Sequence, residues 1–235
     1  MRKLVLLIGL MLFMLNISAQ DYKTLCHKIN DLNTAVLKGS IKRADAAKQF
    51  KTLINQLKQS RHVLKVSDEW VFPLRGYNYH AIGGGGSGYS DKGYNYLDGN
   101  KHTAHPAHDI FINDKNQDCI DDHTHKPVDV LAVDYGIVIA CSNTWETNSN
   151  LRGGKYIWIY DDHGNIIYYA HNQVIFVNPG DEVKAGQKIA EVGRSGYNAF
   201  KKRSPTHLHF SAFKLVDDLP VPYNPYSQLK KAKPL

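Results

Sequence analysis

The chain has 235 residues, and its 29 lysines and arginines outnumber its 22 aspartates and glutamates, which gives a formal net charge of +7 at pH 7. It has no basic helix interleaved with aromatic residues, so the sequence does not indicate a nucleic-acid-binding protein. Its three cysteines form no CxxC pair, which argues against a zinc site built from cysteines. The mild basicity suits a polyanionic surface, although many exported proteins carry a similar charge.

Residues 1–19, in the opening stretch MRKLVLLIGLMLFMLNISAQ, are typical of a secretory signal peptide. A short basic start precedes an apolar run over residues 4–15, and the small residues Ser18 and Ala19 follow it. We expect cleavage near Ala19, and therefore a protein that is secreted or located in the periplasm or cell envelope. The apolar run is too short to span a bilayer comfortably and no second one follows, so no stable membrane insertion is expected after cleavage.

Residues 20–65 differ in pattern from the rest of the chain and predict an α-helical hairpin. Apolar residues recur at helical spacing on both sides of the tripeptide KGS, where Gly39 ends one helix and Ser40 begins the next. The residues in this pattern are Leu25, Ile29, Leu32, Val36, Ala46, Phe50, Leu53 and Leu57. We expect these apolar stripes to dock on the main domain or on a partner.

Residues 66–100 predict a connecting loop, because the stretch from 81 to 100 is rich in glycine and tyrosine and has no periodicity. Residues 101–220 then alternate short apolar stretches with turn residues, as antiparallel strands do. The segments 127–133 and 136–141 predict one strand pair, 155–171 a hairpin that turns at DHGN, and 207–215 the last strong strand.

The sequence therefore predicts a mainly β fold, an antiparallel β-sandwich or partly open barrel, with the N-terminal helical hairpin added to it. Residues 221–235 are expected to form a tail that makes one turn and then frays.

Two histidines flank one leucine in the strand-like stretch SPTHLHFSAF. On a strand, His207 and His209 point to the same face, and burying two imidazoles side by side costs free energy unless something uses them. The sequence HPAHD adds His105 and Asp109, which a bend at Pro106 would bring together. Two imidazoles, one carboxylate and an open fourth position make a catalytic zinc site, with His209 as the third ligand and His207 close by to handle protons. On spacing alone, the two histidines fit two separate hydrogen-bonded side chains equally well.

The order of HPAHD, YYAHN, GDEVKAGQKIAEVGRSG and THLHF, over about residues 100–215, resembles the lysostaphin-type, LytM-like zinc endopeptidases. The resemblance implies a duplicated-hybrid-motif-like fold and one catalytic zinc ion held by His105, Asp109 and His209. It also implies catalytic roles for the two remaining histidines of these motifs. His207 would take and return the proton, and His171 would stabilise the oxyanion or orient the water.

By this resemblance, residues 101–220 form a zinc metallopeptidase domain that hydrolyses peptide bonds in peptidoglycan stems or cross-links by zinc-activated water. The scissile bond stays open, because D-alanyl cross-links and glycyl bonds are both cleaved within the family. Ala107, Asn172 and an insertion at 113–126 depart from the family pattern, and they leave the shape of the groove open. The loop at 83–96 is a candidate wall of that groove or an ordinary flexible loop.

Two alternatives remain beside the enzyme. The first is a non-catalytic cell-wall-binding or hydrolase-activating module of the same fold. The second is a latent enzyme in which the helical hairpin, or the loop before His105, covers the zinc. The role of the hairpin and the oligomeric state are not readable from the sequence.

The insertion DKNQDCIDD raises the question of a second cation site. Asp114, Asn116 and Asp118 match the first three positions of a calcium loop, but Cys119 and His125 stand where such a loop needs glycine and glutamate. We therefore predict a solvated polar insertion rather than a Ca²⁺ site.

Two further features stay open. Cys119 and Cys141 are close enough in sequence to form a disulfide outside the cytoplasm, or else they and Cys26 are all reduced. His108 directly precedes Asp109, lies on the opposite face of a regular strand, and is expected to be buried or to support the site.

Overall fold

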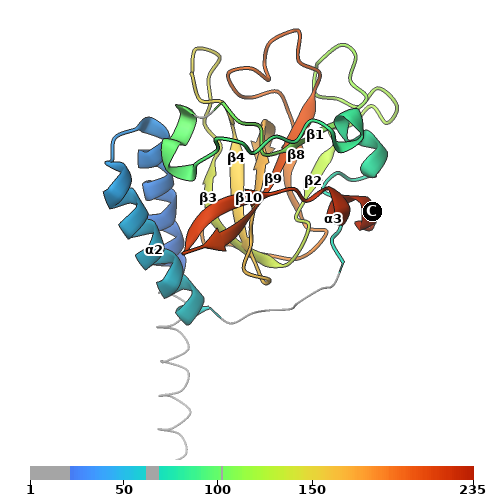
Figure 1. Ribbon diagram of the computed structural model, residues 1–235. Helices are drawn as coiled ribbons and strands as arrows, with labels where there is room; N and C mark the ends of the chain where they lie inside the picture. The colour runs from blue at the N-terminus through green and yellow to red at the C-terminus, as the bar shows by residue number, and fades with distance from the viewer. Residues whose placement is uncertain (1–21, 62–68, 102) are drawn as a thin grey trace, which may run out of the picture.

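The computed structural model describes residues 22–61, 69–101 and 103–235. The predicted signal peptide, together with His62 and His102, lies outside these residues. Within the described ranges the strands form two sheets in which every strand pair is antiparallel (Figure 1). The larger sheet has the order β1-β9-β5-β4-β3-β7, with β10 also paired to β9, and the smaller has the order β2-β8-β6.

The helices are a segment over residues 22–38, α2 (Arg43–Ser60) and α3 (Tyr226–Lys231), with short 3₁₀ turns η1 (Tyr79–Ala81), η2 (Gly83–Gly86) and η3 (Tyr96–Lys101). The strands are β1 (His108–Phe111), β2 (Asp129–Leu131), β3 (Gly136–Ser142), β4 (Tyr156–Asp161), β5 (Ile166–Ala170), β6 (Asn172–Ile175), β7 (Glu182–Val183), β8 (Lys188–Val192), β9 (His207–Val216) and β10 (Leu219–Tyr223). The predicted mainly β, antiparallel fold with N-terminal helices is confirmed, and the sheets do not close into a barrel.

Both faces of the larger sheet are covered, and the alternation of side chains along β4 shows how. Ile157 and Ile159 pack into the core between the two sheets. Tyr156, Trp158 and Tyr160 point to the opposite face, where they pack against the N-terminal helices. Because successive strand residues face opposite sides, one strand contributes to two separate cores. The molecule is layered as helices, larger sheet and smaller sheet, with α2 lying along one side of the sheet in Figure 1.

The helical hairpin docks on the main domain through polar as well as apolar contacts. Asn33 donates a hydrogen bond of 2.9 Å from its amide to the hydroxyl of Tyr156. At the end of α2, Arg61 forms an ion pair with Asp162, and the two side chains are only 4% and 0% exposed. A charge buried to this degree is tolerated because the opposite charge lies beside it. The helices therefore form part of the folded core.

The predicted hairpin turn at DHGN forms between β4 and β5. The carboxylate of Asp161 accepts hydrogen bonds from the backbone N–H groups of His163 at 3.0 Å and Asn165 at 2.7 Å. Gly164 has φ +84°, a left-handed conformation that glycine adopts without strain.

Two expectations about chain connection are wrong. Segments 127–133 and 136–141 do not pair, because β2 joins β8 in the smaller sheet while β3 joins β4 and β7 in the larger one. The C-terminal tail does not fray after α3, because the backbone of Lys233 pairs with Trp70 and Phe72 at 2.8 Å. In addition, Leu229 of α3 is fully buried.

Cys26, Cys119 and Cys141 are all unpaired thiols, so the Cys119–Cys141 disulfide is not formed. Burial raises the pKa of the Cys26 thiol to about 12 and that of the Cys119 and Cys141 thiols to about 11. Among the residues described, no helix combines the length and the apolar character needed to cross a membrane.

Candidate metal centre

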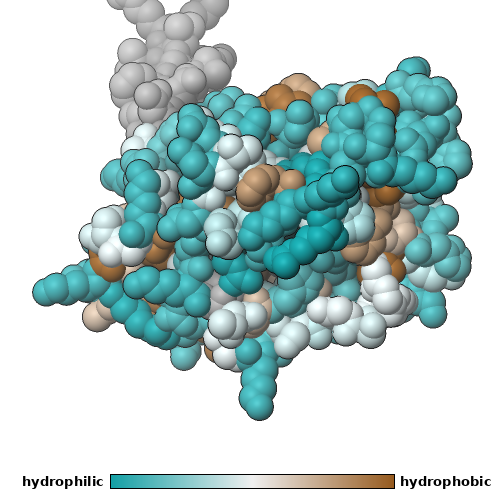
Figure 2. Space-filling view, turned by 90° about the horizontal axis from the view of Figure 1, so that it is seen from above, coloured by the Kyte–Doolittle hydropathy of each residue, from teal (hydrophilic) through white to brown (hydrophobic). Residues whose placement is uncertain are grey.

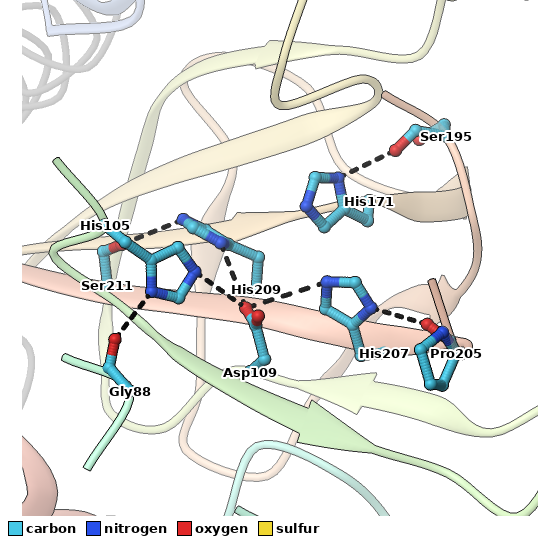
Figure 3. Close-up of polar contacts among 9 residues, drawn as sticks. All are labelled: Gly88, His105, Asp109, His171, Ser195, Pro205, His207, His209 and Ser211. Carbon is cyan, nitrogen blue, oxygen red and sulfur yellow. Dashed lines mark hydrogen bonds and ion pairs between the residues drawn. The ribbon is translucent and has the colours of Figure 1, made fainter. Parts of the chain in front are cut away.

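The pairing of β1 with β9 places Asp109 beside the two histidines of THLHF. Asp109 is the register partner of His209, and Phe111 is the partner of His207. The oxygen Oδ1 of Asp109 lies 3.2 Å from Nδ1 of His209 and 3.7 Å from Nε2 of His207. Two distant parts of the sequence therefore meet at one carboxylate oxygen (Figure 3).

His105 approaches the same oxygen from the segment before β1. Its Nε2 lies 3.2 Å from Oδ1 of Asp109. Its backbone pairs with Ser90, with hydrogen bonds of 2.8 and 2.9 Å in the two directions. The ring nitrogen Nδ1 lies 3.0 Å from the carbonyl oxygen of Gly88. The glycine- and tyrosine-rich loop is thus ordered here, and it fixes the orientation of His105.

His105, Asp109 and His209 each offer one ligand atom, and these atoms lie within 4.8 Å of one another. Among the residues described, this is the one group of three or more His, Cys, Asp or Glu side chains with such spacing. A carbonyl oxygen only accepts hydrogen bonds, so Nδ1 of His105 carries a proton and Nε2 is the ring nitrogen that is left to bind a metal ion. An imidazole held in this way by a backbone carbonyl is oriented as in most metal-bound histidines. The donor set fits a zinc ion with an open position.

His171 and His207 lie beside these three residues but do not belong to the group of metal-ligand atoms. The Nδ1 atom of His171 lies 2.8 Å from the carbonyl oxygen of Ser195, and that of His207 lies 2.7 Å from the carbonyl oxygen of Pro205. Both rings therefore hold their proton on Nδ1 and direct Nε2 toward the centre of the site (Figure 3). In the neutral state each Nε2 accepts a hydrogen bond or a proton.

Burial decides the protonation states at the site. It lowers the pKa of His171 well below the usual value, helped by His207 and His209 nearby, and it also lowers the pKa of His209. For Asp109, burial alone would raise the pKa, but hydrogen bonds with His105 and His209 outweigh it and lower the pKa far below normal. The hydrogen bond to Asp109 raises the pKa of His105. The ionised carboxylate is the form of Asp109 that binds a metal ion, and the histidine ligands have to be neutral when they bind one.

A pocket of about 230 Å³ opens over these side chains. Its walls include all five predicted site residues together with Arg152 and Tyr168. The structure therefore brings together the five residues predicted to bind zinc or to act in catalysis.

The side chain of His108 points away from the pocket. It is 1% exposed, and its Nε2 contacts the amide oxygen of Asn224 at 2.8 Å. This agrees with the expectation that it is buried on the opposite face of β1.

The oxygens of the insertion serve its own loop. Asp114 is buried and accepts hydrogen bonds from the backbone of Asp118 and Cys119 and from the hydroxyl of Thr206, at 3.1, 2.9 and 2.6 Å. The carboxylate of Asp118 accepts from Ile120 at 2.9 Å. These contacts account for the aspartates of DKNQD as loop-stabilising groups.

Part of this site also matches a known protein family. Residues 115–221 match the sequence profile described as Peptidase family M23. Over this stretch the chain is similar to the M23 peptidases. The matched range includes His171, His207 and His209, whereas His105 and Asp109 precede it and join the site through the pairing of β1 with β9.

The chain is similar to several known proteins. Over 61 residues it is 46% identical to Outer membrane antigenic lipoprotein B of Histophilus somni, a match that spans 26% of this chain and 16% of the lipoprotein. The catalytic domain of lysostaphin from Staphylococcus simulans is 27% identical, with a TM-score of 0.41, over 62% of this chain and 90% of that one. A putative glycyl-glycine endopeptidase LytM from Ruminococcus gnavus is 23% identical, with a TM-score of 0.48, over 80% and 72% of the two chains.

The sequence patterns do not reveal the backbone groups that orient the histidines of the site. Gly88, Ser195 and Pro205 act through backbone carbonyls, which any residue possesses, so no side-chain signal marks them. Arg152 was also missed, because it lies in a loop with no motif of its own.

Proposed function

We propose that this chain is an exported zinc-dependent endopeptidase that hydrolyses peptide bonds in peptidoglycan stems or cross-links. The observation that carries the proposal is the convergence of His105, Asp109 and His209, whose ligand atoms lie within 4.8 Å of one another. Two further imidazoles, in His171 and His207, direct Nε2 toward the same point. Similarity to the M23 peptidases supports the reaction class.

His105, Asp109 and His209 would hold the zinc ion through Nε2, a carboxylate oxygen and Nδ1. When bound, zinc supplies Lewis acidity, which activates water and polarises the scissile carbonyl. The open side of the site faces the pocket, where a peptide can enter.

His207 is the better proton acceptor of the two remaining histidines. Its Nε2 lies 3.7 Å from the carboxylate of Asp109, which is close enough to interact with a proton carried on that atom. His171 is 8% exposed, and burial lowers its pKa, so it stays neutral and accepts a hydrogen bond through Nε2. This assignment favours the water-orienting role of His171 over the oxyanion-stabilising one, because a neutral ring with its proton on Nδ1 has no donor to offer at Nε2.

The export and the substrate rest on separate arguments. Residues 1–19 have the pattern of a signal peptide. The match to an outer membrane lipoprotein supports a location in the cell envelope. Cleavage near Ala19 removes Arg2 and Lys3 and leaves a net charge of +5, from 27 basic and 22 acidic residues, which suits contact with an anionic wall polymer.

The test is mass spectrometry of purified peptidoglycan after incubation with the zinc-loaded protein. We expect soluble fragments with new amino and carboxyl termini, and their masses identify the bond. Protein stripped of metal by a chelator should release none, and activity should return with added zinc. If the zinc-loaded protein binds peptidoglycan and releases no fragment, the non-catalytic wall-binding module replaces the enzyme.

A further inference from the structure

Arg152 is the charged side chain in the pocket that neither the zinc site nor the proton transfer uses. Among the residues that line the pocket, Asp109 carries the negative charge and Arg152 the permanent positive charge. The guanidinium is half-buried and close enough to act electrostatically on His105 and Tyr168, which line the same pocket.

The backbone around Arg152 is held in place on several sides. Its N–H donates to the side-chain oxygen of Asn100 at 2.9 Å, and the carbonyl of Leu151 accepts from Tyr197 at 3.0 Å. The carbonyl of Gly153 accepts from the backbone of His171, also at 3.0 Å. Arg152 therefore projects from a segment tied directly to the active-site histidine. A fixed backbone of this kind is what a binding side chain needs to reach its ligand reproducibly.

Close packing adds a further constraint. A Cβ atom on Gly196 would lie 2.4 Å from the carbonyl oxygen of Arg152. A Cβ on Gly153 would lie 2.0 Å from the hydroxyl of Tyr168. The loop that carries Arg152 is thus pressed against the pocket wall on both sides, and it has little room to swing away.

Charge indicates what such a site attracts. With a divalent cation in place, one carboxylate from Asp109 leaves the pocket positive, and Arg152 increases this excess. The neighbouring loop lines the pocket through Asn198, Ala199 and Ser204, whereas its basic residues at 201–203 lie outside the lining. This end of the molecule, viewed from above in Figure 2, is largely hydrophilic. A positive pocket selects anionic groups, and arginine binds carboxylates with two parallel hydrogen bonds.

We propose that Arg152 binds a free carboxylate on the substrate residue next to the scissile bond. The inference rests on the proposed function and adds the substrate class. The preferred substrate is an acidic stem-peptide cross-link, and oligoglycine bridges, which carry no carboxylate beside the bond, are poor substrates.

The test uses two synthetic cross-linked stem peptides that differ in one group. In one, the carboxylate beside the scissile amide is free, and in the other it is amidated. A pentaglycine peptide serves as the third substrate. We expect kcat/KM to be about 10- to 100-fold higher for the acid peptide than for its amide, mainly through KM, because hydrogen bonds to charged groups have this strength.

Three variants test whether Arg152 causes the preference for the acid peptide. Arg152→Gln should bring the acid-to-amide ratio of kcat/KM close to one, and Arg152→Lys should restore part of the preference because it keeps the charge. Arg203→Gln is the matched control: it removes one exposed positive charge from the neighbouring loop, outside the pocket lining, and should leave the ratio unchanged. Thermal unfolding of each variant confirms that it is folded.

The remaining outcomes separate this inference from the proposed function. If the native protein cleaves the acid and amide peptides equally well, or if Arg152→Gln lowers kcat for both by the same factor, Arg152 does not recognise a carboxylate, although the enzyme stands. Preferred cleavage of pentaglycine would overturn the inference in the same way. If the native protein cleaves none of the peptides and no peptidoglycan, the proposed function itself fails.

Discussion

The rings of His171 and His207 lie 4.9 Å apart, centroid to centroid, and each is hydrogen-bonded through Nδ1 to a backbone carbonyl. The two imidazoles therefore present the same atom, Nε2, to one point in space. Their surroundings differ, because His207 has the carboxylate of Asp109 within 3.7 Å of that atom. This difference is the reason why the proposed function assigns the two histidines different tasks.

Replacing His207 should remove proton transfer and leave the metal in place. We expect His207→Ala to lower kcat by about two to four orders of magnitude, the usual contribution of a positioned acid–base group. Zinc content, measured by inductively coupled plasma mass spectrometry, should stay at one ion per chain. Loss of zinc from this variant would mean that His207 is a ligand.

Replacing His209 should have the opposite pattern. His209→Ala removes one of the three ligand atoms. We therefore expect zinc content to fall from one ion per chain to near zero and peptidase activity to be lost. His27→Ala, which changes an exposed helix residue, is the matched control and should keep its zinc. Full zinc content in His209→Ala would contradict the ligand set.

The position of His171 should depend on a glycine in a neighbouring loop. Gly154 has φ +63°, and a Cβ there would lie 2.3 Å from the carbonyl carbon of Ser195, whose oxygen holds His171. Gly154→Ala should lower the free energy of unfolding by about 1–3 kcal/mol and also lower kcat. Gly39→Ala has nearly the same φ, +65°, with no atom within 4 Å of the added Cβ. If both variants lose kcat equally, the contact with Ser195 is not the cause.

The buried ion pair should hold the helical hairpin to the sheet. Arg61→Met leaves the fully buried carboxylate of Asp162 without its arginine partner, and we expect a loss of about 3–5 kcal/mol in the free energy of unfolding, measured with urea. Lys58→Met breaks a more exposed pair with Asp218 and should cost less than about 1 kcal/mol. Equal losses of stability in the two variants would show that burial does not increase the contribution of the Arg61–Asp162 pair.

Stability should also depend on pH through Asp161. Burial raises the pKa of this carboxyl from 3.8 to about 6, so between these values the folded state holds a proton that the unfolded state has lost. Stability from this group is present below pH 3.8 and falls as pH rises through 6, by about 2–3 kcal/mol. Asp161→Asn cannot titrate, so its unfolding free energy relative to the native protein should increase between pH 4 and pH 7. A difference that is constant with pH would contradict the shift.

The site was predictable because its chemistry is carried by side-chain types at short, repeated spacings. HPAHD and THLHF each place two functional groups on one short segment, and β1 and β9 need only pair for the ligands to meet. The apolar pattern of 20–65 likewise predicted helices. It did not reveal the face they cover, because helical periodicity describes the helix and says nothing of its partner.

The incorrect predictions about strand pairing and the C-terminal tail also have physical causes. The incorrect pairing of 127–133 with 136–141 came from assuming that neighbouring strands pair. The chain instead crosses between sheets after β2, and the N–H of Val133 bonds to the hydroxyl of Tyr169, 36 residues away, at 3.0 Å. The order of the C-terminal tail depends on Trp70 and Phe72, which lie more than 150 residues earlier in the chain. Contacts of that range leave no local pattern.

The hairpin and the metal centre occupy neighbouring parts of one sheet face. His209 and Phe213 belong to the same strand, and Phe213 stacks on Trp158 beneath the helices. A fusion protein that contains the two sheets of this chain would also need residues 22–61. A chain that starts at Trp70 would present that aromatic surface bare to solvent, and it would precipitate rather than gain a more accessible active site.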